Sequence, residues 1–239
     1  MIESPHNEKL KLVRKLRDRK HRERETAFVT EGEDLVEAGL SAGAEPRFLL
    51  TAAGSGLGGD EVDPGLLAGV SSLGSGTRAI AVWPQRWAEP GGSPCLYLHG
   101  VGDPGNVGAI VRIAHGLLGG TVVLGPGCAD PFSPKAVRAS MGSIFAQPLA
   151  RGGVEQTPAP RVALVAHRGR ALAGLEGVAT LCLGAEREGL PGEVLAACDS
   201  QVTISLRPGG AESLNVAAIA AICAERISSL AMPEGPSNA

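Results

Sequence analysis

The sequence predicts an α/β fold in which a parallel sheet with helices on both faces follows a small N-terminal αβ unit. From residue 95 onward, short apolar strands alternate with helical segments. Such alternation, with strands that are apolar throughout, is typical of a parallel sheet covered on both faces. A stretch rich in Pro and Gly, residues 89–94, separates this part from residues 1–88. We therefore expect two domains, 1–88 and 95–230, joined by a linker.

The N-terminal unit is expected to begin with an amphipathic helix over Asn7–Arg19, because Leu10, Val13 and Leu16 recur at helical spacing. Apolar runs and turn residues then predict the strand Ala27–Thr30, the helix Gly32–Ala42, the strand Arg47–Thr51, a glycine-rich turn at Ala53–Gly59, the helix Pro64–Val70 and the strand Arg78–Trp83.

The second domain is expected to contain six strands and four helices. The predicted strands are Cys95–His99, Thr121–Leu124, Ser143–Pro148, Arg161–Ala166, Val178–Leu183 and Gln201–Ser205. The predicted helices are Val107–Leu118, Ser133–Met141, Leu190–Ala196 and Ser213–Leu230. Residues 231–239 have no apolar pattern, and we expect a disordered tail there.

The composition is that of a soluble globular protein, with 44% hydrophobic and 20% charged residues among 239. No apolar run is long enough to span a bilayer, so no membrane association is expected. The five cysteines form no CxxC pair, which predicts free thiols in a reducing compartment and neither disulfides nor a metal site. The cytoplasm is therefore the expected location.

The charge is distributed unevenly along the chain. Residues 9–24 contain nine Lys or Arg against two acidic residues, a local net charge of +7, whereas the remaining 223 residues have a net charge of −10. A compact basic segment on an acidic body favours binding to a polyanion, although such a run can also be a solvated helix face. The segment predicts contact with nucleic acid.

Two stretches match Gly-x-Gly-x-x-Gly. The first, Gly54–Gly59, is followed by Asp60–Pro64 and not by a helix, so we interpret it as a loop. The second, Gly100–Gly105, lies between a strand and a helix, but Asp103-Pro104 interrupts it and the next strand does not end in an acidic residue. A nicotinamide-binding oxidoreductase is therefore a poor alternative that stays open.

Three blocks contain candidate functional residues, and each has a structural interpretation as well. Asn106 starts a helix, where it can cap, and Arg112 lies off the buried stripe of that helix. Gly184–Pro191 leaves a buried strand, and its glycines allow the backbone to approach a planar ligand. Ser213-Leu214-Asn215 begins the last helix, with Ser213 expected as its cap.

Together the three blocks closely resemble the signature motifs of the SpoU (TrmH-type) RNA 2′-O-ribose methyltransferases of the SPOUT superfamily. The matching segments are Asp103–Arg112, Asp130–Gly142, Gly184–Pro191 and Glu212–Ala217. Residues 1–88 are similar to the RNA substrate-binding domain of the family. The resemblance implies S-adenosylmethionine as cofactor, a C-terminal trefoil knot and a homodimer whose partner completes the active site.

The resemblance also implies roles for individual residues. The expected catalytic residues are Asn106, Arg112, Glu186, Ser213 and Asn215. The expected cofactor-binding residues are Leu183, Gly184, Gly189, Ile204, Leu206, Ser213 and Leu214, with Ser205 where the family often has Pro. The expected RNA-binding residues are Lys11, Arg19, Arg24, Lys135 and Arg138.

The implied reaction is transfer of a methyl group to a ribose 2′-hydroxyl of structured RNA, for which Arg112 is expected to bind phosphate and not to act as a base, since arginine stays protonated. The separate N-terminal domain favours large-subunit ribosomal RNA over transfer RNA. A non-catalytic RNA-binding or ribosome-assembly protein is the alternative from another class.

Overall fold

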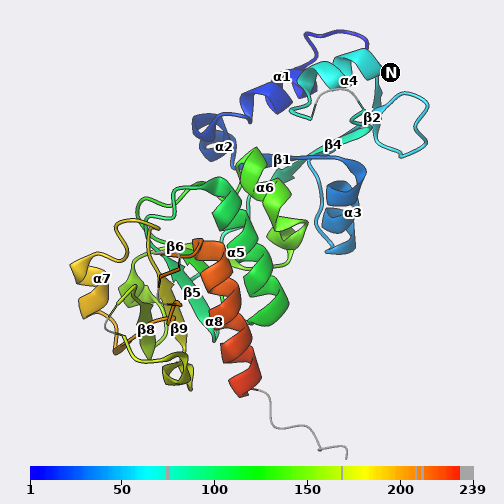
Figure 1. Cartoon of the computed structure of the whole chain (residues 1–239). Coiled ribbons are helices and arrows are strands. Elements are labelled where there is room, and N and C mark those ends of the chain that lie inside the picture. Colours follow the sequence, from blue (N-terminus) through cyan, green and yellow to red (C-terminus); the bar gives the residue numbers. More distant parts are fainter. Residues whose placement is uncertain (74–75, 168, 208, 211–212, 232–239) are drawn as a thin grey trace, which may run out of the picture. The chain divides into compact units, whose positions relative to one another are not determined.

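The structure, a computed structural model, describes residues 1–73, 76–167, 169–207, 209–210 and 213–231 (Figure 1). It contains two compact units. Unit 1 consists of Met1–Arg86 and Asp130–Ala146, and unit 2 of Trp87–Ala129 and Gln147–Ala239. The segment 130–146, which lies between two strands of unit 2 in the sequence, thus belongs to unit 1 by its contacts. Residues 232–239 of the predicted tail lie outside the described part.

Unit 1 is a small mixed αβ domain with a four-stranded sheet in the order β1-β4-β2-β3. Strand β4 runs antiparallel to β1 and β2, and β3 pairs parallel with β2. Its elements are α1 (Glu8–Lys15), α2 (Arg19–Glu25), β1 (Ala27–Glu31), α3 (Glu33–Ser41), β2 (Phe48–Ala52), β3 (Asp60–Val62), α4 (Pro64–Val70), β4 (Ala79–Pro84), α6 (Pro134–Ser140) and the 3-10 helix η1 (Ser143–Phe145).

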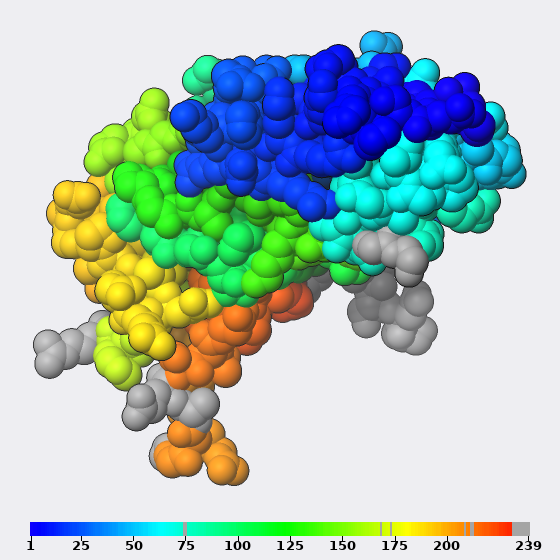
Figure 2. Space-filling view, turned by 90° about the horizontal axis from the view of Figure 1, so that it is seen from above, coloured from blue at the N-terminus to red at the C-terminus, as the bar shows by residue number. Residues whose placement is uncertain are grey.

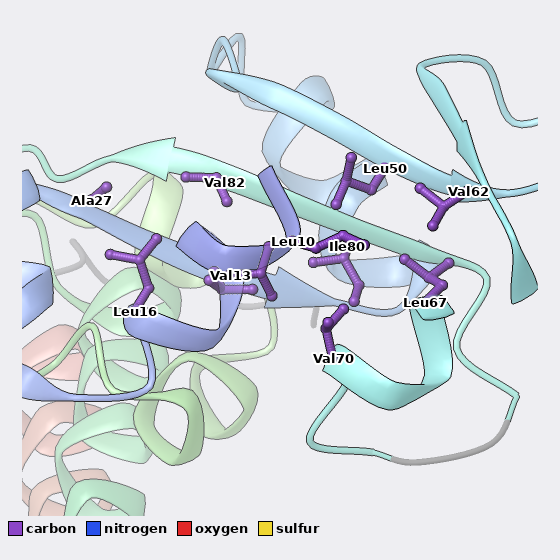
Figure 3. Close-up of a cluster of buried hydrophobic side chains, with 11 residues drawn as sticks. Leu10, Val13, Leu16, Ala27, Leu50, Val62, Leu67, Val70, Ile80 and Val82 are labelled. Carbon is purple, nitrogen blue, oxygen red and sulfur yellow. The ribbon is translucent and has the colours of Figure 1, made fainter. Parts of the chain in front are cut away.

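The core of unit 1 lies between α1, α4 and one face of this sheet (Figure 3). Leu10 and Val13 of α1 and the following Leu16 are almost completely buried. They pack with Leu67 and Val70 of α4 and with the strands. The apolar stripe predicted at helical spacing therefore covers the sheet, which leaves the basic face of α1 outward. Figure 2 shows this dark-blue N-terminal segment open at the surface.

The single helix predicted over Asn7–Arg19 is wrong at its end, because α1 stops at Lys15 and a second helix, α2, starts at Arg19. Asp18 adopts an extended conformation between them. The Arg17 guanidinium reaches away and donates to the carbonyl of Val70, 2.7 Å away. A tertiary contact thus replaces the last helical turn.

The strand predicted over Ser143–Pro148 is also wrong. Ser143–Phe145 form a 3-10 helix, and the strand β7 begins only at Leu149, in unit 2. Phe145 packs in unit 1, where its ring centroid lies 4.7 Å from that of Trp83 and 5.7 Å from that of Phe28. The apolar run that predicted a strand therefore forms a 3-10 helix, and its Phe145 belongs to an aromatic cluster. Strand β3 was not predicted, because Asp60–Val62 contains two acidic residues.

Unit 2 contains a six-stranded sheet in the order β10-β8-β9-β5-β6-β7, in which every pairing is parallel. The α/β class is confirmed. Its elements are β5 (Cys95–Leu98), α5 (Pro104–Leu117), β6 (Val122–Leu124), β7 (Leu149–Arg151), η2 (Val154–Gln156), β8 (Arg161–Leu164), η3 (Leu172–Leu175), β9 (Thr180–Leu183), α7 (Gly192–Ala196), β10 (Ser200–Val202) and α8 (Val216–Ala231).

Both faces of this sheet are covered. Tyr97 and Cys182 point to one face, where they pack with Val194 of α7. Leu96, Leu98, Leu181 and Leu183 alternate with them, so they point to the opposite face, and all four are buried. Helices α5 and α8 lie side by side on one side of the strands, and α7 lies on the other (Figure 1). No described helix is long and apolar enough to cross a membrane.

Candidate functional site

A cavity of about 390 Å³ lies in unit 2. Its walls come from segments that follow three neighbouring parallel strands, β8, β9 and β10, together with the start of α8. In open α/β sheets, ligands bind in a crevice outside the carboxyl ends of the strands. The volume and the mostly aliphatic lining suit a small organic ligand.

All seven residues expected to bind the cofactor line this cavity: Leu183, Gly184, Gly189, Ile204, Leu206, Ser213 and Leu214. The sequence interpretation omitted the wall that follows β8, formed by Val165, Ala166 and His167, and also Thr203. The parallel order β8-β9 brings the end of β8 to the same edge as the end of β9. No sequence motif marks residues 164–167, so only the strand order could have shown that they line the cavity.

The loop after β9 closes on itself. The amide of Gly189 donates to the carbonyl of Ala185, 2.9 Å away. A Cβ on Gly184 would lie 2.5 Å from the carbonyl oxygen of Gly189, so a side chain at 184 would collide with the backbone. Gly189 has a φ of +68°, which few residues other than glycine adopt. Both glycines are therefore required for this loop shape.

Asn106 does not cap helix α5. The side chain of Asp103 accepts from the backbone amide of Asn106 at 3.0 Å and is the cap, with Pro104 in the first turn. The structural interpretation of Asn106 as a cap is therefore wrong, and its side-chain amide is available for other contacts.

The amide of Asn106 joins residues from all three sequence blocks. Its Nδ2 donates to Oε1 of Glu186, in the cavity wall, and its Oδ1 accepts from Nδ2 of Asn215 at 2.9 Å. Residues separated by 80 and 109 positions in the sequence thus meet in one hydrogen-bonded chain. The two bonds together fix the orientation of the Asn106 side chain, because its amide has one donor end and one acceptor end.

The cap of helix α8 is Asn215 and not Ser213. Its Oδ1 accepts from the backbone amide of Ala217 at 2.9 Å, and α8 begins at Val216. The same side chain donates to Asn106, so the helix terminus and the polar chain share one residue. Ser213 is exposed and lies in the cavity wall, three residues before the helix.

Arg112 lies on the exposed side of α5, whereas Val107, Ile110 and Val111 are buried. Within the part of the chain that the structure describes, Arg112 has no hydrogen-bond or ion-pair partner and does not line the cavity. Arg112 follows Asn106 by less than two helical turns, and its side chain is exposed to solvent.

The five residues expected to bind RNA all lie in unit 1. Lys11 pairs with Glu8, Arg19 with Glu23 and Arg24 with Glu25, all at or near the surface. Exposed pairs of this kind are weak and exchange readily for another anion. Arg138 donates to the hydroxyl of Ser72, 3.1 Å away, and Lys135 lies on α6.

Arg22 is one of the nine basic residues counted as polyanion contacts, but it is only 4% exposed. Its Nε lies 2.7 Å from Oδ2 of Asp130, and its Nη1 donates to the carbonyls of Leu16 and Arg17. Asp130 in turn accepts from the amide of Phe132. Arg22 is therefore structural, and the charge that this segment offers to a ligand is lower than the sequence suggested.

Among the described residues, no cluster of three or more His, Cys, Asp or Glu side chains could hold a metal ion.

The SpoU rRNA Methylase family matches residues 93–225, more than half of the chain, and the MRM3-like substrate binding domain matches residues 7–68. The chain belongs to the SpoU family. The family match includes the cavity and all three residues of the hydrogen-bonded chain Glu186–Asn106–Asn215. The second match covers α1 to α3 and most of α4 in unit 1.

Known relatives agree with this assignment. The chain is 30% identical to the 23S rRNA (guanosine(2553)-2′-O)-methyltransferase RlmP of Bacillus subtilis, over 92% of this chain and 96% of that protein. It is 36% identical to an uncharacterized tRNA/rRNA methyltransferase of Mycobacterium bovis, but the match spans only 61% of this chain and 57% of that protein. An AdoMet-bound rRNA methyltransferase structure from Sinorhizobium meliloti superposes with a TM-score of 0.82, at 27% identity over 97% of this chain and 98% of that one.

Proposed function

We propose that this SpoU-family protein transfers a methyl group from S-adenosylmethionine to a ribose 2′-hydroxyl of large-subunit ribosomal RNA. The observation on which the proposal mainly rests is the hydrogen-bonded chain Glu186–Asn106–Asn215 at the wall of the cavity. The likeness to a 23S rRNA 2′-O-methyltransferase over nearly the full length of both chains supports the substrate class.

The cavity fits this cofactor. Its volume suits a ligand of that size, and the aliphatic walls from Leu183, Ile204 and Leu214 would enclose an adenine ring. Gly184 and Gly189 allow the backbone of this loop to close on itself in the cavity wall, which would bring main-chain amides and carbonyls against the ligand. When bound, S-adenosylmethionine supplies an electrophilic methyl group on a sulfonium. Glu186 and Glu188 in the wall place negative charge near this cation.

The polar chain would position the reacting groups. Since Asn215 both caps α8 and orients Asn106, the amide of Asn106 is held in one orientation toward Glu186. We propose that Asn106, Glu186, Asn215 and Ser213 align the ribose for in-line attack. Holding two reactants in the correct geometry can supply a large part of a rate enhancement.

Arg112 is proposed to bind the phosphate next to the target ribose. Its exposed guanidinium lacks a partner within the described residues, and a guanidinium matches the geometry of a phosphate. The cation would also stabilise the alkoxide that develops as the 2′-hydroxyl loses its proton to the phosphate or to water. Lys11, Arg19, Arg24, Lys135 and Arg138, all in unit 1, are proposed to hold RNA backbone.

The remaining features follow from the family and are part of the proposal. We propose a homodimer in which the partner completes the site, a trefoil knot in the segments around the cavity, and RNA docking by an N-terminal domain, 1–88, separate from a methyltransferase domain, 95–230. The cytoplasm is the proposed location, because all five cysteines are free thiols.

A methylation assay with labelled S-adenosylmethionine tests the function. The purified protein is incubated with unmodified 23S rRNA, 16S rRNA and bulk tRNA, and modified riboses are mapped by their resistance to alkaline cleavage. We expect one 2′-O-methylated position in 23S rRNA, and none with Arg112→Ala. Methylation of tRNA alone would show that the substrate is transfer RNA and not ribosomal RNA. The name of the Mycobacterium bovis relative includes both classes of RNA. Cofactor binding without methylation of any RNA would favour a non-catalytic RNA-binding protein.

A further inference from the structure

Two cysteine thiols of unit 2 lie in contact. Cys182 is on β9, is fully buried, and its strand is paired with β5 on one side and β8 on the other. Cys198 follows the C-terminus of α7 and is half-buried. The two Sγ atoms are 3.6 Å apart, within hydrogen-bonding distance for sulfur. Cys95 and Cys128 instead donate to the backbone carbonyls of Gly91 and Leu98.

The surroundings make the two thiols unequal. The hydrogen bond with Cys182 and the nearby Arg161 guanidinium lower the pKa of Cys198, against burial and the carboxylate of Asp199. The same hydrogen bond, together with burial, raises the pKa of Cys182. Arg161 is held in place by the carbonyl of Thr157, 2.7 Å away, and also reaches the carbonyl of Ala197. Cys198 is therefore the nucleophile that solvent can reach, and Cys182 is its buried neighbour.

The pair lies at the two ends of the segment that contains the longest continuous part of the cavity wall. Residues 183–190 follow Cys182 directly and line the cavity, and α7 then leads to Cys198. Leu190 and Val194 belong to the same buried cluster as Cys182. A bond between the two sulfurs would enclose this whole loop in a covalent ring.

We propose that Cys182 and Cys198 form a redox-active pair that a hydroperoxide oxidises to a disulfide, and that this disulfide weakens binding of the methyl donor in the adjacent cavity. The effect on binding rests on the proposed function, whereas the disulfide itself does not.

The chemistry balances in two steps. The Cys198 thiolate attacks one oxygen of hydrogen peroxide, the O–O bond breaks, and Cys198 sulfenic acid and hydroxide form. The Cys182 thiol then attacks the sulfenic sulfur, the S–O bond breaks, and its proton leaves with the oxygen as water. The peroxide is reduced by two electrons and the two thiols are oxidised to the disulfide. A dithiol reductant reverses the reaction.

Closing the bond requires movement, since the sulfurs must approach from 3.6 Å to about 2.05 Å. Cys182 is held within the sheet by strands on both sides, so Cys198 and the end of α7 must shift. Leu190 precedes α7 and lines the cavity, so the shift changes the wall that contacts the ligand. Interiors are close-packed, and such displacements are transmitted and not absorbed.

Thiol counting and peptide mapping of the peroxide-treated full-length protein test the disulfide. We expect two thiols to be lost together, a mass lower by two hydrogens, and a cross-linked peptide joining Cys182 to Cys198 that dithiothreitol releases. Cys198→Ser should show no such loss, while Cys128→Ser, a half-buried cysteine bonded to oxygen, should behave like the wild type. Oxidation of Cys198 to sulfinic acid without a cross-link would overturn the proposal.

Calorimetric titration with S-adenosylmethionine tests the effect on the cavity. We expect the dissociation constant of the oxidised wild type to be higher by about fivefold or more, a coupling of ordinary size, and to recover after reduction. Peroxide-treated Cys198→Ser should bind like its untreated form. Equal affinity of both wild-type states would overturn the regulatory part alone. A cross-link in a protein that never binds the cofactor would instead refute the proposed function.

Discussion

At the scale of single residues, the side-chain amide of Asn106 is the junction of the candidate site. Asp103 caps the helix in its place, so the amide donates to Glu186 and accepts from Asn215. Removing it leaves a carboxylate without its donor and a second amide without its acceptor, so the loss affects the alignment of the site more than the stability of the fold.

We predict that Asn106→Ala lowers the single-turnover methylation rate by about 10²-fold, the usual effect of removing one positioned hydrogen-bonding group. Glu193→Gln, at an exposed glutamate of α7 that does not line the cavity, is the control and should keep most of the rate. Circular dichroism checks that both variants are folded. An Asn106→Ala rate within twofold of the wild type would show that the amide does not act in catalysis.

Cys198 allows a prediction of pH dependence. Because its thiolate is stabilised by the Cys182 thiol and by Arg161, against Asp199, its pKa lies below that of an ordinary thiol. The rate of alkylation by iodoacetamide should therefore rise at lower pH than that of a free cysteine. Cys182→Ala removes the hydrogen-bonding partner and should move the rise of the Cys198 profile to higher pH. An unchanged profile would exclude the hydrogen bond.

At the scale of elements, the loop after β9 illustrates how backbone shape decides binding. Gly184 and Gly189 meet where the loop closes, with no room for a Cβ at 184. The sequence predicted that this loop follows a buried strand and that its glycines allow the backbone to approach a ligand. The sequence could not show which of its glycines contacts which backbone atom, because that depends on the closure between Ala185 and Gly189.

We predict that Gly184→Ala lowers the affinity for S-adenosylmethionine at least about tenfold, since the loop must open to accommodate the alanine side chain. Calorimetry measures the affinity. Gly192→Ala, at the start of α7 with no atom within 4 Å of the added carbon, is the matched control and should bind normally. Normal affinity of Gly184→Ala would mean that the loop does not hold the cofactor.

The ion pair between Arg22 and Asp130 ties α2 to the start of the segment 130–146 within unit 1. Both side chains are almost fully buried. The sequence suggested an RNA contact for Arg22, because a run of basic residues gives no sign of which member turns inward. A partner 108 positions away decides it.

We predict that Arg22→Met lowers the free energy of unfolding by about 3–5 kcal/mol, because it leaves the Asp130 carboxylate buried without its partner. Urea denaturation provides the measurement. Arg19→Ala breaks an exposed pair with Glu23 and should cost no more than about 1 kcal/mol. Similar small losses in both variants would contradict the structural role of Arg22.

At the scale of the whole molecule, the proposed substrate is a polyanion, and its binding should depend on salt. Arg19 and Arg24 are exposed, and their pairing with nearby glutamates is weak enough to exchange for phosphate. Each phosphate contact releases counterions, so the logarithm of the affinity falls linearly with the logarithm of the salt concentration.

We predict that the double variant Arg19→Ala/Arg24→Ala lowers the slope of this dependence by about two, measured by filter binding to 23S rRNA fragments. Arg226→Ala on α8, an exposed arginine outside unit 1, should leave the slope unchanged. Unchanged slopes in both variants would show that α2 does not contact the RNA backbone.

The sequence by itself determined the α/β class, most of the elements and the seven cavity-lining residues that belong to the motifs, because periodicity and short motifs are local properties. Only the tertiary structure decided that Asn106, Glu186 and Asn215 form one hydrogen-bonded chain, that Arg22 is buried, that residues 143–145 join an aromatic cluster and that Cys182 meets Cys198. These facts are contacts between residues far apart along the chain. Side-chain partners at such separations are set by packing, and no local pattern contains them.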